Sequence, residues 1–195
     1  MCVITCYKYF SNTIFFLKWI RQIPMIQKRK YLITLLLMFI IINAAFAQKT
    51  KYQSIFIYNF SKYIKWPDNF NQGKFVIGVL GESELYDDLN SMAKAKKETN
   101  GLTIEVRQFK SIGQLSDCNL LFLSDQFCDQ IGNVKSAISG KPMLIITDKK
   151  GMAKNGAIIN FVEDSGKIKF ELNQSAASRL GLVISSSLAN LAILV

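Results

Sequence analysis

Histidine is absent from this 195-residue chain, and proline and cysteine are scarce, with three and four copies respectively. The lack of histidine excludes serine–histidine and cysteine–histidine nucleophile pairs and every zinc site built on an imidazole. Two of the four cysteines, Cys2 and Cys6, precede a segment with the features of a leader, so the other two are too few for a cysteine-only zinc site. The chain therefore offers little to most classes of hydrolase and metalloenzyme.

A leader is indicated at residues 25–47. A basic cluster at 28–30 precedes an apolar run at 31–42, and Ala45-Phe46-Ala47 follows. Basic, apolar and then small-x-small is the order of a secretory signal peptide. The apolar run is shorter than the roughly 20 residues that a membrane-spanning helix needs. An uncleaved signal anchor is the alternative, and the small residues Ala45 and Ala47 favour cleavage.

Cleavage after Ala47 would leave Gln48 as the first residue of the exported protein. Residues 1–24 do not resemble the short basic start of a signal peptide, so we predict that translation begins at Met25, with residues 1–47 as the leader and 48–195 as the domain. The leader holds six Lys and Arg residues and no acid, so its removal lowers the formal charge from +10 to +4. The remaining basic residues are scattered among acids, which argues against a nucleic-acid partner.

Residues 48–195 read as one α/β domain with a layered, mixed and mostly buried sheet flanked by helices. Helical and strand-like apolar patterns alternate, and a late hairpin is followed by C-terminal helices. The expected helices are 49–65, 84–97, 125–138, 173–181 and 185–194, and the expected strands are 74–81, 102–109, 119–124, 142–148, 156–162 and 167–172.

The first helix carries an aromatic stripe. Tyr52, Phe56, Phe60 and Tyr63 recur at spacings of three and four, which predicts that all four cover the sheet. Pro67 disfavours helical geometry at the residue before it, so the helix should end near Trp66.

Strand ends supply one candidate ligand crevice. If the strands are parallel, Gly81, Ser83, Asp125 and Asp148 meet at one edge of the sheet, where doubly wound proteins bind small ligands. Helix capping by Ser83 and turn roles for the others explain the same residues and are favoured. No acid–base pair, metal site or cofactor site emerges, which favours a binding or regulatory protein over an enzyme.

Cys118 and Cys128 would face an oxidising compartment after export. A strand after Cys118 and a helix that begins near Asp125 would keep the two Cα atoms beyond the roughly 7 Å limit for a disulfide. We predict two free thiols, with Cys118 buried and Cys128 more accessible.

Two long motifs resemble the YfiR family of periplasmic regulators. "YNFSKYIKWP" is similar to the family's opening helix, and "GAIINFV" followed by "KIKFELNQSAASRLGLVISSSLANLA" to its closing section. "FVIGVLGES" looks like the family's first strand and loop, and the likeness extends over residues 51–193. The matched motif residues, with structural and partner-binding roles both open, are Tyr58, Asn59, Phe60, Trp66, Pro67, Asn160, Phe161 and Asn173.

The resemblance implies a periplasmic protein without catalysis or cofactor. It implies inhibition, by protein contact, of a membrane-bound diguanylate cyclase or sensor kinase, with an outer-membrane protein as a competing partner. Family members are often dimeric, so a homodimer is also open. Disulfides cross-link the well-studied members, whereas here only Cys118 has an obvious counterpart. A small-molecule sensor that uses the strand-end crevice is the alternative function, and a hydrolase is a remote one.

Overall fold

The structure is a computed structural model that describes residues 25–195 except 69, 71 and 72. The chain forms two compact units, of which the second spans Ala47–Val195. Helix α2 (Met25–Tyr63) begins in the first unit. The large apolar side chains at 31–38 of this helix are 49–69% exposed. Within the described part of the chain, no helix combines the length and apolarity needed to cross a bilayer.

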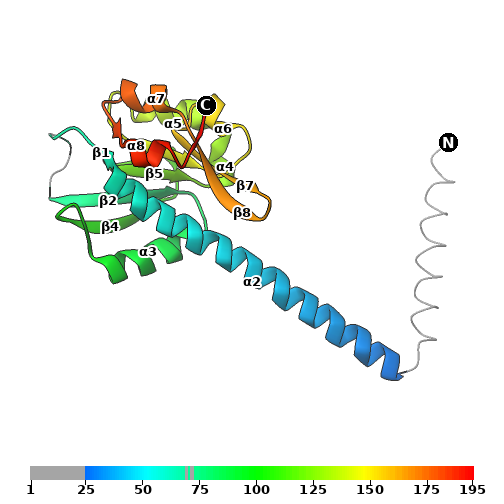
Figure 1. The fold of residues 1–195 in the computed structure, drawn as a ribbon. Coiled ribbons are helices and arrows are strands. Elements are labelled where there is room, and N and C mark those ends of the chain that lie inside the picture. The colour runs from blue at the N-terminus through cyan, green and yellow to red at the C-terminus, as the bar shows by residue number, and fades with distance from the viewer. Residues whose placement is uncertain (1–24, 69, 71–72) are drawn as a thin grey trace, which may run out of the picture. The chain divides into compact units, whose positions relative to one another are not determined.

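The second unit contains an eight-stranded sheet with the order β10-β8-β7-β6-β5-β2-β4-β3 (Figure 1). Its five central strands are parallel, whereas β8 and β3 run antiparallel to β7 and β4. The strands are β2 (Lys74–Leu80), β3 (Glu98–Thr99), β4 (Leu102–Phe109), β5 (Leu120–Leu123), β6 (Leu144–Thr147), β7 (Ile159–Asp164), β8 (Lys167–Leu172) and β10 (Ile193–Leu194). The predicted α/β class and mixed sheet are confirmed.

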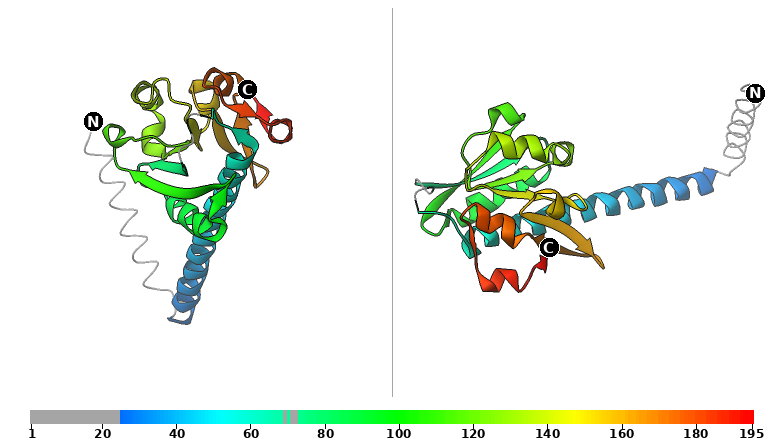
Figure 2. Two further views of the ribbon diagram at one scale, coloured as in Figure 1. Left: turned by 90° about the vertical axis from the view of Figure 1, so that its left-hand side faces the viewer. Right: turned by 90° about the horizontal axis from the view of Figure 1, so that it is seen from above.

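Helices cover both faces of this sheet (Figure 2). The end of α2 and all of α3 (Leu85–Lys96) lie on one face, and α4 (Asp125–Cys128), α5 (Ile131–Ala137) and α6 (Met152–Asn155) lie on the other. From β2 the chain winds outward in two directions, to β4 on one side and to β5 on the other, which is doubly wound topology. The remaining elements are η1 (Ile112–Gln114), α7 (Gln174–Arg179), α8 (Ser186–Ala189) and a separate two-stranded sheet of β1 (Ile64–Lys65) and β9 (Val183–Ile184).

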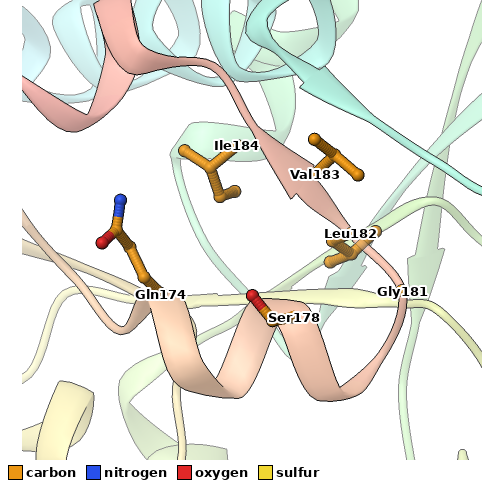
Figure 3. Close-up of a pocket in the computed structure, with 6 residues that line it drawn as sticks. All are labelled: Gln174, Ser178, Gly181, Leu182, Val183 and Ile184. Atoms are coloured by element: carbon orange, nitrogen blue, oxygen red, sulfur yellow. The ribbon is translucent and has the colours of Figure 1, made fainter.

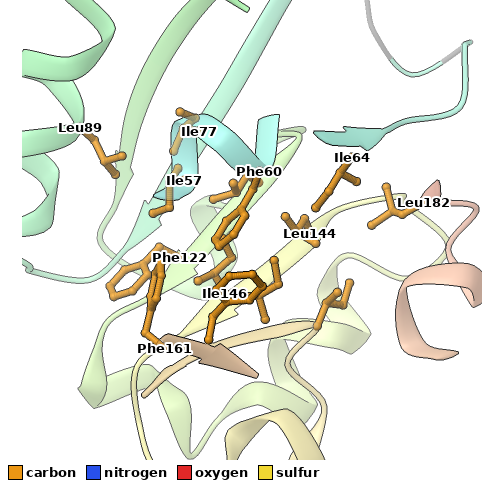
Figure 4. Close-up of a cluster of buried hydrophobic side chains, with 14 of the residues drawn as sticks. Ile57, Phe60, Ile64, Ile77, Leu89, Phe122, Leu144, Ile146, Phe161 and Leu182 are labelled. Carbon is orange, nitrogen blue, oxygen red and sulfur yellow. The ribbon is translucent and has the colours of Figure 1, made fainter. Parts of the chain in front are cut away.

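Each face of the sheet has its own apolar core. Alternate residues of β2 point to opposite faces, so Ile77 packs under α2 and α3 while Val76 and Leu80 pack under α5. Gly78 points to the α5 face, where an added Cβ would lie only 2.9–3.0 Å from the side chains of Phe109, Cys118 and Leu121. The face under α2 and α3 has the larger core, part of which Figure 4 shows.

The aromatic stripe was predicted with the wrong rotation about the helix axis. Phe60 is fully buried and Phe56 packs beside it, but Tyr52 and Tyr63 are 49% and 48% exposed. Steps of four residues overshoot a full turn by about 40°. The two tyrosines are therefore rotated away from the side of the helix that faces the sheet. The buried line is instead made of Gln53, Ile57, Phe60 and Ile64.

Three boundaries also differ from the prediction. α2 ends at Tyr63, earlier than Trp66, because Ile64 and Lys65 pair with Ile184 and Val183 as strand β1. The helix expected at 125–138 is two short helices, and the helix expected at 185–194 is only α8, followed by the edge strand β10. In that last segment, backbone pairing of Ile193 and Leu194 with β8 replaces helical hydrogen bonds.

Candidate interaction surface

The opening motif is largely internal. Phe60 stacks against Phe161 at a centroid distance of 5.9 Å. Trp66 is buried, donates its indole N–H to the backbone oxygen of Asn119 at 3.1 Å, and meets the ring of Phe75 edge-on. Pro67 is half-buried against Gly181, where an added Cβ would lie 3.3 Å from the proline ring. These motif residues join the end of α2 to the sheet and to the closing segment.

Tyr58 and Asn59 differ from that internal set. The ring of half-buried Tyr58 has the ammonium of Lys62 at 4.6 Å and that of Lys96, on α3, at 5.5 Å. Asn59 is half-buried, and its amide makes no hydrogen bond to the residues that the structure describes. Because the Asn59 amide has no partner among the described residues, it is available to form a hydrogen bond with a molecule that docks beside it.

Asn160 forms the centre of a buried polar chain across three strands. The Thr147 hydroxyl on β6 donates to Asn160 Oδ1 at 2.8 Å, and Asn160 Nδ2 donates to the Glu171 carboxylate on β8 at 2.9 Å. Asn160 and Thr147 are fully buried. Asn173 caps α7 by accepting from the Ala176 N–H. In the structure both asparagines support the fold.

One flank of α2 exposes apolar side chains. Tyr52, Ile55, Asn59 and Tyr63 are spaced by three or four residues, so they share one helix face. On the opposite flank, Ser61 hydrogen-bonds Thr99 of β3. The exposed face therefore points away from α3 and β3, toward the β8 side of the sheet, where Phe56 already meets the ring of Phe170 at 5.8 Å.

The closing segment adds further apolar side chains on the β8 side. β10 is the edge strand beside β8, and its Ile193 and Leu194 are 43% and 56% exposed. Leu191, just before it, is 72% exposed. The Ser185 N–H donates to the Tyr63 backbone oxygen at 3.0 Å and so fastens this segment to the end of α2. We call the following set the apolar flank: Tyr52, Ile55, Tyr63, Leu191, Ile193 and Leu194.

A cavity of about 370 Å³ lies beside β9 (Figure 3). Its lining is contributed by α7, by the turn that follows it and by β9, namely Gln174, Ser178, Gly181, Leu182, Val183 and Ile184. Val183 is 63% exposed. Exposed apolar side chains next to a hollow are typical of protein-interaction surfaces.

Sequence patterns did not identify most of the apolar flank. Ile55 was overlooked because it falls outside the aromatic stripe, and Leu191, Ile193 and Leu194 lie in the segment that was predicted as the final helix, 185–194. A usable signal was the run of apolar residues at the end of the chain without the polar residues that a solvated helix face requires.

The predicted crevice residues meet at the carboxyl edge of the sheet, but local packing occupies much of that edge. A Cβ at Gly81 would collide with the side chains of Ser124, Gln126 and Phe127. The N-cap position of α3 is Glu84, whose side chain makes no capping bond, so the predicted N-cap Ser83 lies one residue too early. The Ser83 hydroxyl does accept from the Leu85 N–H at 3.3 Å. The crevice itself stays a prediction.

The two acids of the predicted crevice have different surroundings. Asp148 accepts from Lys49 at 3.2 Å and Gln53 at 3.3 Å, both on α2. Asp125 is largely exposed, with Lys149 at 3.9 Å. At the same edge, the buried hydroxyl of Ser124 has no hydrogen-bond partner within the described residues. It is the one buried side-chain oxygen or nitrogen without a partner among the residues that the structure describes.

Both cysteines of the domain are free and buried. The expectation that Cys128 is the more accessible thiol is wrong: it is fully buried, with its sulfur 3.5 Å from the Ser124 backbone oxygen. The Cys118 sulfur lies 3.5 Å from that of Met143. Burial raises the pKa of each thiol to about 12, so both are protonated and unreactive near neutral pH.

Several charged groups of the described residues are engaged in ion pairs. In residues 25–195, apart from those left undescribed, no three Cys, Asp or Glu side chains gather as metal ligands would. The strongest carboxylate perturbation is at Glu105, where hydrogen bonds from Arg107 and Lys74 lower the pKa to about 2. That pairing stabilises the ionised form, which suits a surface ion pair rather than a general acid.

Comparison with known proteins matches the chain to one family model and, at low identity, to solved structures. A sequence model described as YfiR/HmsC-like matches residues 50–193. No curated protein matches the chain. One solved structure, described as the ABC domain in complex with L-Trp from Streptococcus pneumonia, is 17% identical with a TM-score of 0.45. The likeness covers 62% of this chain and 54% of that one.

Proposed function

The chain belongs to the YfiR/HmsC-like family, and we propose that it is a periplasmic, non-catalytic regulator that acts by binding another protein. The observation that carries this proposal is the apolar flank, whose six side chains are 43–72% exposed. Leaving several large apolar groups in water is unfavourable by about 25 cal/mol per Å² relative to burying them. A partner that covers the flank would recover that free energy.

The family and the predicted leader support the choice of partner class. Export with cleavage after Ala47 would deliver the domain to the periplasm, where it meets the outer domains of inner-membrane enzymes. We propose the periplasmic domain of a diguanylate cyclase or sensor kinase as the target, held inactive by the contact. An outer-membrane protein that binds the same flank would relieve the inhibition by competition.

A complementation experiment tests the proposal. Deleting the gene should raise cyclic-di-GMP or the output of the kinase, and the wild-type protein should restore the original level. Leu191→Asp should fail to restore it, because a charge at the flank must be desolvated on binding. Gln130→Asp is the matched control, since it adds the same charge at an exposed position between α4 and α5, and it should restore signalling fully.

Two results would contradict the proposal. Unchanged signalling in the deletion strain would remove the regulatory role. Full restoration of signalling by Leu191→Asp would show that the flank does not take part in regulation. A second copy of this chain is the competing occupant of the flank. Sedimentation of the purified protein distinguishes the two occupants, because Leu191→Asp would convert a dimer to a monomer only if the flank forms a homodimer.

A small-molecule sensor at the carboxyl edge of the sheet is the second candidate. The unpartnered buried hydroxyl of Ser124, beside Gly81, favours it. A ligand that uses this hydroxyl should raise the melting temperature of the wild type. The effect should disappear in Ser124→Ala, and a metabolite screen that finds no such shift would count against this candidate.

A further inference from the structure

A second cavity, of about 230 Å³, lies between α5 and α7, and none of its described lining residues belongs to the apolar flank. Its apolar lining is aliphatic, contributed by Ile138, Ile145, Ile158, Ala176 and Leu180. The three isoleucines are nearly or fully buried. Since none of the described residues that line this cavity is aromatic, it suits a flexible hydrocarbon chain rather than a flat ring.

The polar part of the same lining is positively charged. Lys135, Lys141 and Arg179 line the cavity, and none of its other described lining residues is acidic. Lys141 is paired with Asp117. Among the described residues, neither Lys135 nor Arg179 has an ion-pair partner. Two unpaired cations from different elements, α5 and α7, therefore border one apolar hollow.

Gly156 lets Lys135 come close to the wall of the cavity. Its φ of +124° is a conformation that side-chain-bearing residues rarely adopt. A Cβ there would lie 3.3 Å from Cδ and 3.4 Å from Nζ of Lys135. Lys135 is exposed overall, but because Gly156 has no Cβ the lysine ammonium can lie close to this part of the wall.

We propose that this cavity binds a small aliphatic carboxylate, with its chain against the isoleucines and its carboxylate between Lys135 and Arg179. Charge-assisted hydrogen bonds from a lysine and an arginine are the strong kind, and the apolar lining excludes a purely inorganic anion as the best ligand. The volume is below the 300–1,000 Å³ typical of drug-sized ligands, which points to a short or medium chain. The proposal is independent of the protein contact at the apolar flank.

Calorimetric titration of the purified full chain with octanoate tests this inference. Saturable one-site binding is expected, with 1-octanol and inorganic phosphate each at least about tenfold weaker, since each lacks one half of the recognition. Lys135→Gln and Arg179→Gln should each weaken octanoate binding by about tenfold or more. Lys154→Gln, which removes an exposed lysine of α6 outside the cavity lining, should leave it unchanged.

The cavity floor provides a second, independent variant. Ala176→Leu places a larger side chain in the cavity lining and should abolish octanoate binding while the unfolding midpoint stays near that of the wild type. Equal affinity for octanol and octanoate, wild-type affinity in both cation variants, or no binding of octanoate would each overturn the inference. Loss of octanoate binding in Leu191→Asp would overturn its independence from the apolar flank.

Discussion

Phe60 carries much of the packing between α2 and the sheet. Its ring is fully buried, 5.0 Å from that of Phe170 and 5.9 Å from that of Phe161. Phe60→Ala should lower the free energy of unfolding by about 3–5 kcal/mol, because it removes apolar contacts and leaves a cavity. Lys51→Ala, at an exposed position of the same helix, should change it by no more than about 0.5 kcal/mol. Urea unfolding followed by circular dichroism measures both.

That experiment also separates packing from partner contact. If Phe60→Ala kept wild-type stability and lost only signalling, the aromatic contacts with Phe161 and Phe170 would contribute nothing to the free energy of unfolding. Phe60 would then belong to an interface, contrary to its burial.

Cys118 and Cys128 should not react with thiol reagents in the folded protein. Burial raises the pKa of each to about 12 from 9.0, so the reactive thiolate is scarce and the reagent cannot reach it. Titration with a chromogenic disulfide at pH 8 should find no reactive thiol before unfolding and two after it in the exported protein. A single fast-reacting thiol, lost in Cys128→Ala, would show that Cys128 is open to solvent after all.

The same thiols make stability fall at alkaline pH. Their folded pKa values lie above the unfolded ones, so their contribution is fully present below about pH 9 and is lost as the pH rises toward 12. The unfolding free energy should therefore decrease above pH 9. In a Cys118→Ala, Cys128→Ala double variant that decrease should be shallower, and an unchanged slope would assign it to other groups.

At the scale of elements, the Thr147–Asn160–Glu171 chain ties strands β6, β7 and β8 together. Asn160→Asp would put a second carboxylate where an amide now donates to Glu171 at 2.9 Å. Position 160 is fully buried and Glu171 is half-buried. Two carboxylates at that distance cannot both ionise without strong repulsion, so one keeps a proton and its pKa is raised. The variant should be nearest to wild-type stability below about pH 4 and should lose stability as the pH rises. Asn160→Ala, which adds no charge, should show a loss that depends little on pH in the same unfolding series.

Elements were predictable where residue patterns are local. The inner strands β2, β5 and β6 are continuous apolar runs, and the late hairpin turns at a Ser-Gly pair, so both could be identified from the sequence. The rotation of α2 about its axis could not, because tyrosine is equally suited to a core and to a wet border. The pairing of Ile64 with Ile184 and of Ile193 with Glu171 depends on contacts between distant segments. No local pattern contains that information.

The candidate site divides in the same way. Asn160 and Asn173 were found as motif positions, but their structural roles depend on Glu171 and Ala153, to which they donate. The strand-end residues Gly81 and Asp148 were placed at one edge correctly, since parallel strands share their carboxyl ends. The packing of Ser124 and Phe127 over Gly81 is set by tertiary contacts. The apolar flank could not be predicted from the sequence, because it depends on the sheet order that places β10 at the edge.

At the scale of the whole molecule, the core belongs to the second unit. Every side chain described as buried lies at or after Gln53, and the second unit begins at Ala47. A protein that starts at Gln48 keeps this core, as well as the bonds from Lys49 and Gln53 to Asp148. Mass spectrometry of the exported protein should find that start. An N-terminus that retains residues 31–42 would indicate an anchored form instead.

The protein that starts at Gln48 should unfold like the full chain. For a domain of this size, a change of 1 kcal/mol shifts the melting temperature by about 2–4 °C, and the difference between the two proteins should stay within that range. A protein that starts at Tyr58 is the comparison, because it loses buried Gln53, Ser54 and Ile57 together with both bonds to Asp148. It should melt at least about 10 °C lower, or fail to fold, since several core contacts go at once. Calorimetry of the three proteins decides the matter: a large drop already at Gln48 would mean that residues before it contribute to the core.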